Sequence, residues 1–264
     1  MALTALAVLD GTVLPADEAT IGVTDLGLLR GDGVFEVISV YDGRLFAMED
    51  HLRRMANSAQ NLRLEIDLGA VSADIDALLA EAGPVTGAIR FFVTRGGRRV
   101  GLVEAVPEER EPLVLASIEY VPPRVLDGVK SLSYGGNMLA TRLAVEKGAT
   151  EALLVTPHGR VLEGPTSSVF VSLDGETLVT PPLSDRVLDS ITRRRLLALL
   201  PFAREEVVTR EELRGAREAF FASTTREVQP VARIDDDDLP AVPGPLTQQA
   251  ADAFAAHIRD ELGA

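Results

Sequence analysis

The chain has 264 residues, of which 46% are hydrophobic, and its formal net charge at pH 7 is −14. This length and apolar content suit one large domain or two modest domains with buried cores. The negative charge argues against nucleic acid and anionic membranes as partners, and no apolar run approaches the ~20 residues of a membrane-spanning helix. We therefore expect neither a nucleic-acid partner nor a membrane partner.

Metal and disulfide chemistry have little support in the composition. The chain lacks cysteine, and its histidines, His51, His158 and His257, are far apart in the sequence. We expect no metal site, although the run Asp235–Asp238 leaves a divalent-cation site as the alternative to a solvated acidic loop. Residues 1–6 lack a basic region before the first apolar stretch, so we expect no signal peptide and a cytoplasmic location.

The first half of the chain predicts a small α+β domain. An Asp-Gly pair interrupts the apolar run 6–14, which is typical of a β-hairpin. The other elements expected are a glycine-rich loop at 25–33, strands at 34–41, 88–95 and 113–118, and helices at 49–59 and about 71–82. Pro122 and Pro123 favour an extended connector, so we place one domain at 1–118, the connector at 119–123 and a larger domain at 124–264.

Strands and helices alternate in the second half. The elements expected there are strands at 129–134, 151–156, 161–163, 169–171, 178–180 and 219–222, and helices at 139–147, 193–200 and about 246–262. Ser190 and Thr192 precede the 193–200 helix, where a hydroxyl can cap the first amides. Together the two halves predict a two-domain protein with both α/β and α+β character.

Lysine is rare in this chain. Of the 26 lysine and arginine residues only Lys130 and Lys147 are lysines, which leaves 24 arginines. A lysine amine can lose its proton when buried and then attack a carbonyl, whereas a guanidinium cannot. Lys147 has a structural explanation, because it ends a helical run just before Gly148. Lys130 is a candidate reactive amine, with an exposed strand lysine as the alternative.

An acid and several hydroxyl groups follow Lys130. Glu163 ends an apolar strand, and Ser/Thr-rich turns occur at 166–168, 190–192 and 223–225. Hydroxyls and helix N-terminal amides together make a phosphate site. Each feature alone is weak, because such turns and a lone glutamate are usually structural. A nucleophilic lysine, a carboxylate and a phosphate cradle are together what pyridoxal phosphate requires.

Seven ordered blocks resemble the fold type IV, class IV pyridoxal-phosphate enzymes. The blocks are Leu29–Glu36, Asp50–Met55, Val129–Leu132, Gly148–Ala152, Leu162–Phe170, Ile191–Arg193 and Ala222–Glu227. This family includes D-amino-acid, branched-chain and (R)-amine transaminases and aminodeoxychorismate lyase. The resemblance extends over nearly the whole chain and implies pyridoxal 5'-phosphate as cofactor, small-molecule amino donors and 2-oxo acid acceptors, and a homodimer with its active site near the subunit interface.

The resemblance also implies a role for individual residues. Lys130 would hold the cofactor as an imine and act as the general base, and Glu163 would keep the pyridinium nitrogen protonated. The other cofactor-binding residues implied are Arg54, Tyr134, Ser167, Leu188, Ile191, Thr192 and Thr224. The phosphate would contact Arg54, Thr224 and the first amides of the 191 helix. Where the family commonly has glycine before that helix, this chain has Ser190.

The substrate is less closely defined. The implied substrate-binding residues are Phe35, Val37, Ser39, Arg95, Arg98, Arg99 and Thr225. Branched-chain members usually carry glycine and a basic residue where this chain has Val37 and Ser39, and the Thr-Thr-x-Arg/Lys pattern of the lyase is also absent. The segment resembles the D-amino-acid and (R)-amine branches. The Arg-x-His carboxylate trap of typical D-amino-acid members is missing, so the three arginines either bind a carboxylate or are solvated loop cations.

These observations predict a class IV transaminase that moves an amino group between a D-amino acid or (R)-amine and a 2-oxo acid. The alternatives within the family are aminodeoxychorismate lyase, which forms 4-aminobenzoate and pyruvate, and a branched-chain L-amino-acid transaminase. A non-catalytic pyridoxal-phosphate-binding protein is the alternative from a different class. The intact Lys130 and Glu163 disfavour this last alternative.

Overall fold

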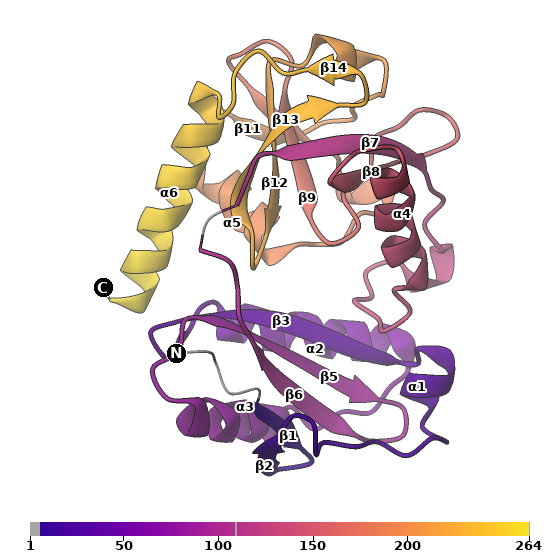
Figure 1. The fold of residues 1–264 in the computed structure, drawn as a ribbon, viewed down its shortest axis with the longest axis vertical. Helices are drawn as coiled ribbons and strands as arrows, with labels where there is room; N and C mark the ends of the chain where they lie inside the picture. The colour runs from indigo at the N-terminus through magenta and orange to yellow at the C-terminus, as the bar shows by residue number, and fades with distance from the viewer. Residues whose placement is uncertain (1–5, 109, 264) are drawn as a thin grey trace. The chain divides into compact units, whose positions relative to one another are not determined.

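A computed structural model describes residues 6–108 and 110–263, which divide into two compact units. Unit 1 consists of the chain up to Glu108 together with Gly128–Tyr134, and unit 2 contains the remainder. Figure 1 shows the elements of each unit in chain order. Residues 1–5, which carry most of the segment behind the signal-peptide expectation, lie outside the described residues.

Unit 1 is built on an antiparallel sheet with the strand order β2-β1-β6-β5-β3-β4. Its strands are β1 (Leu6–Leu9), β2 (Thr12–Pro15), β3 (Gly33–Tyr41), β4 (Arg44–Leu45), β5 (Gly87–Thr94) and β6 (Arg99–Glu104). Its helices are α1 (Leu26–Arg30), α2 (Met48–Leu62) and α3 (Leu68–Ala82). The predicted β1–β2 hairpin is present, and its turn residues Asp10 and Gly11 both have positive φ, as such a tight turn requires.

The two longer helices of unit 1 cover one face of this sheet (Figure 1). Alternate residues of β3, such as Val34 and Ile38, point to that face and pack with Met55 of α2 and Ile75 of α3 in one buried cluster. Because side chains alternate along a strand, Phe35 and the other odd-numbered residues of β3 lie on the opposite face. The sheet of unit 1 therefore has one face covered by α2 and α3 and an opposite face that carries Phe35, Val37 and Ser39.

Unit 2 contains a larger mixed sheet, in the order β11-β10-β9-β12-β13-β7-β8 with β14 beside β13. Its strands are β7 (Leu113–Glu119), β8 (Glu151–Val155), β9 (Ser168–Ser172), β10 (Leu178–Thr180), β11 (Ala203–Glu205), β12 (Glu218–Ser223), β13 (Glu227–Ile234) and β14 (Asp237–Asp238). Its helices are α4 (Gly135–Glu146), α5 (Ile191–Leu199) and α6 (Pro245–Leu262), with 3-10 turns η1 (Arg124–Leu126), η2 (Leu183–Asp185) and η3 (Glu212–Gly215).

Both faces of the β7–β8 region are buried. Leu115 and Leu153 belong to one apolar cluster, whereas the next residue on each strand packs with Ala140 and Ala144 of α4 in another. Continuous burial on two faces explains the nearly uninterrupted apolar sequence of these strands. Lys147 follows α4 rather than lying in its last turn, and its Nζ donates to the Ser117 carbonyl of β7 at 3.1 Å, a structural contact different from the helix-end role expected for it.

The structure differs from the expected domain boundary at two places. Strand β7, which we placed in the first domain, pairs in parallel with β8 and β13 and lies in unit 2. Conversely Gly128–Tyr134, placed in the second domain, belongs to unit 1. Periodicity identifies a strand but not its hydrogen-bonding neighbours, so neither assignment could be read from the local pattern.

Some predicted elements also differ. The segments 129–134 and 161–163 each form only an isolated bridge rather than a strand. The strands β4, β6, β11, β13 and β14 were not predicted. Of these, β13 carries Pro230 and a register shift, both of which weaken a strand pattern. Among the longer strands β13 is the exception, whereas β3, β5 and the helices α2, α3 and α6 lie close to where the sequence predicts them.

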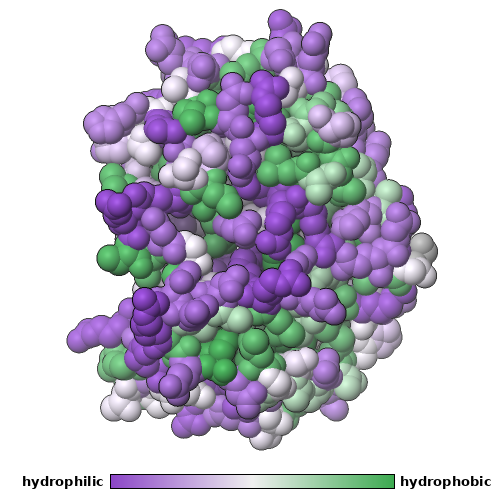
Figure 2. Space-filling view, turned by 180° about the vertical axis from the view of Figure 1, so that it is seen from behind, coloured by the Kyte–Doolittle hydropathy of each residue, from purple (hydrophilic) through white to green (hydrophobic). Residues whose placement is uncertain are grey.

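Within the described part of the chain, none of the helices combines the length and apolar character needed to cross a membrane. The side shown in Figure 2 is largely hydrophilic, with hydrophobic side chains in separate patches.

Candidate active site

Lys130 lies in a short segment that is docked against the start of β3. Its backbone N–H donates to Ser58 Oγ at 3.1 Å, and its carbonyl accepts from Phe35 N at 3.1 Å. Two residues later, Leu132 N donates to the Gly33 carbonyl at 2.9 Å. The backbone of Lys130 is therefore fixed between α2 and β3 within unit 1.

Two glycines make this close approach possible. A Cβ on Gly33 would lie 2.4 Å from the Val93 carbonyl oxygen and 2.6 Å from Leu132 Cδ1. Gly31 has a φ of +66°, and a Cβ there would lie 2.9 Å from Ser133 Oγ. Larger residues at either position would push the lysine segment away from the sheet, so the Gly-Asp-Gly sequence has a packing reason.

The Lys130 amine lies over two aromatic rings. Its Nζ is 4.3 Å from the centroid of the Phe35 ring and 5.6 Å from that of Tyr134. The two rings meet edge to face, with centroids 5.0 Å apart. This contact places the amine on the face of the sheet that α2 and α3 do not cover, together with Phe35.

A buried charge network lies on the other side of β3. Glu36 accepts hydrogen bonds from Arg54 Nε at 2.7 Å and Arg54 Nη2 at 2.6 Å, and its carboxylate lies 2.7 Å from His51 Nδ1. Glu36 and His51 are each about 1% exposed. The sequence identified Arg54 but neither of its partners, although all three lie within two of the quoted blocks. The bidentate pair holds the guanidinium in one orientation.

Burial raises the pKa of Glu36, but the charge of Arg54 and the hydrogen bonds from Arg54 and His51 outweigh it and hold this pKa at about 2. Burial lowers the pKa of His51, and the positive charges of Arg54 and Lys130 lower it further, against the opposing effect of Glu36. Glu36 is therefore ionised and His51 neutral at pH 7. The network is a glutamate–arginine ion pair braced by a neutral imidazole.

Removing Arg54 should destabilise the cofactor-free protein. Arg54→Leu leaves the Glu36 carboxylate buried without its charged partner, which costs roughly 3–5 kcal/mol of unfolding free energy. Because the pKa of Glu36 falls from 4.5 to about 2 on folding, its stabilisation is present above pH ~4.5 and is lost as the pH falls toward 2. The cost of Arg54→Leu should therefore shrink between pH 7 and about pH 3.

Urea unfolding of the cofactor-free variants at both pH values measures this effect. Arg53→Leu is the matched control, because Arg53 is 62% exposed and pairs with Asp50 on the surface of the same helix. Equal losses in the two variants would show that the buried network contributes no more than a surface ion pair.

The expected substrate residues Phe35, Val37 and Ser39 share one face of β3. They lie opposite Phe92, Arg90 and Ala88 of β5 in the antiparallel register. This is the face over which the Lys130 amine lies, as its contact with Phe35 shows. The structure therefore brings these three predicted residues together with Lys130 within unit 1.

The three arginines of the 95–99 loop are paired with aspartates of unit 1. The pairs are Arg95 Nε with Asp32 at 2.6 Å, Arg98 Nη1 with Asp10 at 2.5 Å and Arg99 Nε with Asp74 at 2.8 Å. Arg95 also donates to two carbonyls at the end of α2. Their substrate-binding role stays a prediction, and a substrate carboxylate would have to compete with an aspartate for each of them.

In unit 2, Glu163 is held by its backbone and its side chain. Its carbonyl accepts from Leu154 N at 2.9 Å, which aligns the residue beside β8. Both carboxylate oxygens lie 3.2 Å from Leu188 N. The two residues predicted to contact the cofactor ring from this unit, Glu163 and Leu188, are thus joined directly.

Tyr120 and Asn137 belong to the surroundings of Glu163, and the sequence did not single them out. Burial raises the pKa of Tyr120, and the negative charge of Glu163 raises it further. Tyr120 Oη donates to Asn137 Oδ1 at 3.3 Å, and Asn137 Nδ2 donates to the Pro165 carbonyl at 2.8 Å. This chain of contacts supports the turn after Glu163.

The start of α5 provides amides for an anion. Ser190 is the N-cap, and its Oγ accepts from Arg193 N at 3.3 Å. A single cap leaves the preceding amides of the first turn, those of Ile191 and Thr192, available to a negative group. The buried Arg193 anchors the helix through the Pro181 carbonyl at 2.8 Å. Serine in place of the family glycine is therefore compatible with an open helix N-terminus.

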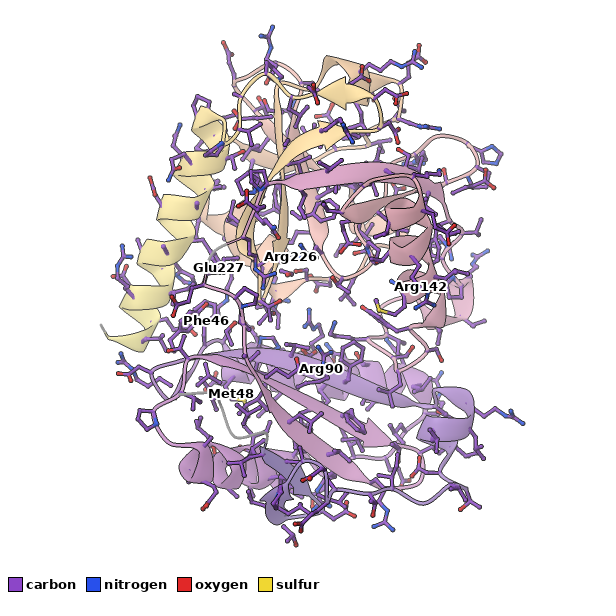
Figure 3. The ribbon with its side chains drawn as sticks, viewed as in Figure 1. Phe46, Met48, Arg90, Arg142, Arg226 and Glu227 are labelled. Carbon is purple, nitrogen blue, oxygen red and sulfur yellow. The ribbon has the colours of Figure 1, made fainter. Side chains whose placement is uncertain are left out.

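An ion pair joins two of the blocks that carry the resemblance. Arg226 Nη2 lies 2.8 Å from Glu151 Oε2, and both side chains are largely buried. The Thr225 carbonyl accepts from Arg110 Nη2 at 3.1 Å. These contacts hold the turn after β12, where Arg226 is labelled in Figure 3, and with it Thr224.

Two buried hydroxyls fit the requirements of a polar ligand. Ser167 and Ser168 are 5% and 3% exposed, and the Oγ atoms of both lack a hydrogen-bond partner within residues 6–108 and 110–263. An unpaired buried hydroxyl costs free energy unless a ligand or water satisfies it. Ser167 follows Glu163 in the block that resembles the family, so its hydroxyl suits the predicted cofactor.

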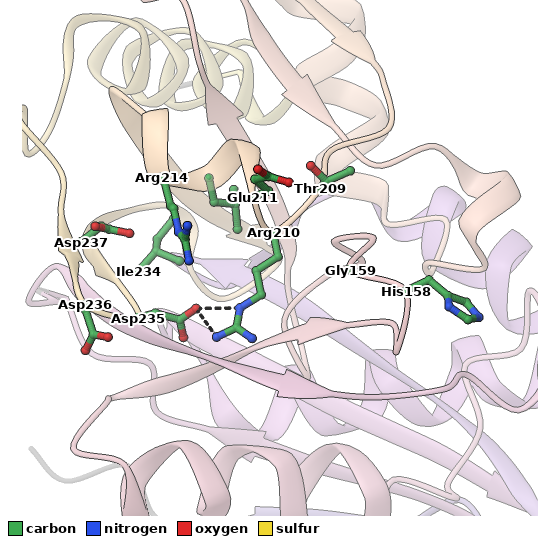
Figure 4. Close-up of a pocket in the computed structure, with 11 residues that line it drawn as sticks. His158, Gly159, Thr209, Arg210, Glu211, Arg214, Ile234, Asp235, Asp236 and Asp237 are labelled. Carbon is green, nitrogen blue, oxygen red and sulfur yellow. Dashed lines mark hydrogen bonds and ion pairs between the residues drawn. The ribbon is translucent and has the colours of Figure 1, made fainter.

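The acidic run 235–238 is not a single solvated loop. Asp235 Oδ1 and Oδ2 accept from Ser117 N and Oγ at 2.7 Å each, and Arg210 also donates to Asp235. Residues 235–237 line a cavity of about 590 Å³ with Arg210 and other polar side chains (Figure 4). Among the described residues, no three carboxylates, imidazoles or thiols converge as a metal site would require.

The two sheets have the architecture of the fold type IV transaminases. The profile of the family described as Amino-transferase class IV matches residues 33–234. The chain therefore belongs to the class IV aminotransferases, and pyridoxal 5'-phosphate is its cofactor.

Individual relatives agree with this assignment. The chain is 32% identical to a D-alanine aminotransferase of Bacillus licheniformis over 277 residues, covering 96% of both proteins. A fold IV transaminase of Curtobacterium pusillum is 27% identical with a TM-score of 0.84, covering 95% of this chain and 99% of that one. A hypothetical aminotransferase of Mycobacterium tuberculosis, solved in a PLP-bound form, is 26% identical with a TM-score of 0.87, covering 97% and 99%.

Proposed function

We propose that this aminotransferase moves amino groups between D-amino acids and 2-oxo acids. The observation that carries the proposal is the 32% identity to a D-alanine aminotransferase over 96% of both chains. The side chains that follow the Gly-Asp-Gly turn add to it. Val37 and Ser39 share a sheet face with Phe35 and the Lys130 amine. Branched-chain members usually carry glycine and a basic residue at these two positions, so the difference lies where a substrate beside the lysine would contact the protein.

Pyridoxal phosphate, when bound, supplies a protonated ring that accepts the electrons left by the departing α-proton of the substrate. Lys130 is proposed to carry that proton, because its amine is fixed over Phe35 and can act as a general base when neutral. Glu163 is proposed to keep the ring nitrogen protonated. Its carboxylate is oriented by Leu188 N, and a nearby negative charge raises the basicity of a nitrogen.

Phosphate-binding residues are proposed within each unit taken by itself. Unit 1 contributes Arg54, whose guanidinium is oriented by the ionised Glu36. Unit 2 contributes the first amides of α5, at Ile191 and Thr192, and the hydroxyl of Thr224. A guanidinium and free amides are complementary to a phosphate dianion. Tyr134 and Ser167 stay predicted cofactor contacts, and Thr225 stays a predicted substrate contact.

A panel of amino donors tests the proposal. We expect D-alanine to give the highest kcat/KM with pyridoxal phosphate and either pyruvate or 2-oxoglutarate as acceptor, above L-leucine and (R)-1-phenylethylamine. A preference for L-leucine would identify a branched-chain enzyme, and pyruvate release from aminodeoxychorismate would identify the lyase. Failure of the cofactor to produce a visible absorbance band with the protein would show that it is not an enzyme of this kind.

We also propose a homodimer. Helix α1 has no buried residue, and Val23, Leu26, Leu28 and Leu29 are all at least 40% exposed. Four large apolar side chains on one short segment form the kind of surface that a second subunit covers. Light scattering on the purified protein should give twice the mass of 28.2 kDa, and a monomer mass would contradict the proposal. The cytoplasmic location stays a prediction.

A further inference from the structure

Arg90 is the charged residue of β5 that shares a sheet face with the lysine. It lies directly opposite Val37 in the β3–β5 register, and its guanidinium carbon is 5.9 Å from the centroid of the Phe35 ring. The Lys130 amine lies 4.3 Å from the centroid of that same ring. An amine and a guanidinium therefore lie beside one aromatic ring on the face of unit 1 that α2 and α3 do not cover. Arg90 is labelled in Figure 3.

Two of the loop arginines, Arg95 and Arg99, are placed less favourably than Arg90 for binding a carboxylate beside Lys130. Arg99 lies opposite Val93 and pairs with Asp74 of α3, which puts it on the helix-covered face. All three of the guanidinium nitrogens of Arg95 are used, by Asp32 and by two carbonyls at the end of α2. Neither side chain is directed to the sheet face that carries Lys130.

Arg90 keeps donor capacity on that face. Its Nε and Nη2 donate to Glu104 at 2.6 Å and 2.9 Å, and its Nη1 makes no hydrogen bond to the described residues. The pair is partly solvated, with Arg90 40% and Glu104 34% exposed. A guanidinium that is already oriented and has an unused donor can bind a second carboxylate. Because the ion pair with Glu104 is partly exposed and therefore weak, a substrate carboxylate can displace Glu104.

We propose that Arg90 binds the α-carboxylate of the amino-acid donor and of the 2-oxo acid acceptor. The proposal rests on the proposed function, because a transaminase substrate must present its amine beside the lysine and its carboxylate to a second group. It also names the substrate class, since a residue of this kind favours amino acids over simple amines. Sequence alone could have pointed to Arg90 as the one charged residue within the apolar strand 88–94.

The test compares Arg90→Gln and Arg90→Lys with the unchanged protein, all loaded with pyridoxal phosphate. A charge-assisted hydrogen bond of 1.5–3 kcal/mol corresponds to a loss of roughly 10–150-fold in kcat/KM for D-alanine. The same variants should leave kcat/KM for (R)-1-phenylethylamine, which lacks a carboxylate, unchanged. Arg90→Lys should recover part of the loss, because lysine keeps the charge but not the forked donors.

Two further variants separate binding from a structural role. Glu104→Gln removes the competing carboxylate and should tighten the binding of D-lactate, a 2-hydroxy acid that cannot donate an amino group. If the pair only stabilised the sheet, Arg90→Gln and Glu104→Gln would change the two donors by the same factors. Arg204→Gln, which breaks the exposed Arg204–Glu206 pair in unit 2, is the matched control and should change nothing.

Calorimetric titration with D-lactate tests the carboxylate-binding role of Arg90 separately from the proposed D-amino-acid transamination. If the unchanged protein does not use D-alanine, the proposed function is wrong, but weaker D-lactate binding in Arg90→Gln would still support the carboxylate site. Equal D-lactate affinity in Arg90→Gln and the unchanged protein, or equal losses for both amino donors, would overturn the proposal.

Discussion

Lys130→Ala should abolish amino transfer while the protein stays folded. Proton transfer by a positioned base contributes roughly 10²–10⁴-fold on its own, and the variant also loses the attachment of the cofactor. The backbone of Lys130 is held by Ser58 and Phe35 through atoms that alanine keeps, so the segment should remain docked. The measurement is kcat with D-alanine and 2-oxoglutarate, together with the thermal unfolding of the cofactor-free protein.

The chain supplies a matched control for this experiment. Lys147, the second of the two lysines, follows α4, donates to the Ser117 carbonyl of β7 and has no proposed chemical role. Lys147→Ala should lose a little stability and keep its turnover. Near-native turnover in Lys130→Ala, or equal losses in both variants, would contradict the role of Lys130.

Glu163→Gln should lower kcat strongly while the cofactor stays bound. The amide has the same shape and can still meet Leu188 N with its oxygen, but it has no charge to keep a ring nitrogen protonated. Removing one preorganised electrostatic partner costs roughly 10²–10³-fold in kcat. The measurements are kcat with D-alanine and the dissociation constant of pyridoxal phosphate for the variant and the unchanged protein.

Glu163→Asp is the companion variant, because it keeps the charge on a shorter side chain and should recover part of the rate. A rate for Glu163→Gln equal to that of the unchanged protein would show that the ring nitrogen does not depend on this carboxylate. Loss of cofactor binding in proportion to the loss of rate would instead make Glu163 a binding residue.

Much of the fold follows from patterns in the sequence. The hairpin at Asp10–Gly11, the long strands β3 and β5, and the helices α2, α3 and α6 all lie where periodicity and turn residues place them. These elements are long or carry residues with few conformational alternatives, so local preference and tertiary packing agree. The family and the cofactor could also be predicted, because seven separate blocks occur in one order.

The partners of charged residues could not be predicted. The sequence showed Arg95, Arg98 and Arg99 as three cations in a short loop, but the aspartates that pair with them are distant in the chain. The same holds for Glu36, which the resemblance includes only as part of a block, and for Arg90, whose place beside Lys130 depends on strand register. Pairing over long sequence separations is set by topology, which local patterns do not determine.

The most direct test of the central claim uses the scarcity of lysine. The protein is incubated with pyridoxal phosphate, reduced with borohydride and digested, and the modified peptide is located by mass spectrometry. We predict the phosphopyridoxyl mass on the peptide that contains Lys130, with Lys147 unmodified. Modification at Lys147 alone, or at neither lysine, would contradict the assignment of Lys130 as the residue that carries the cofactor.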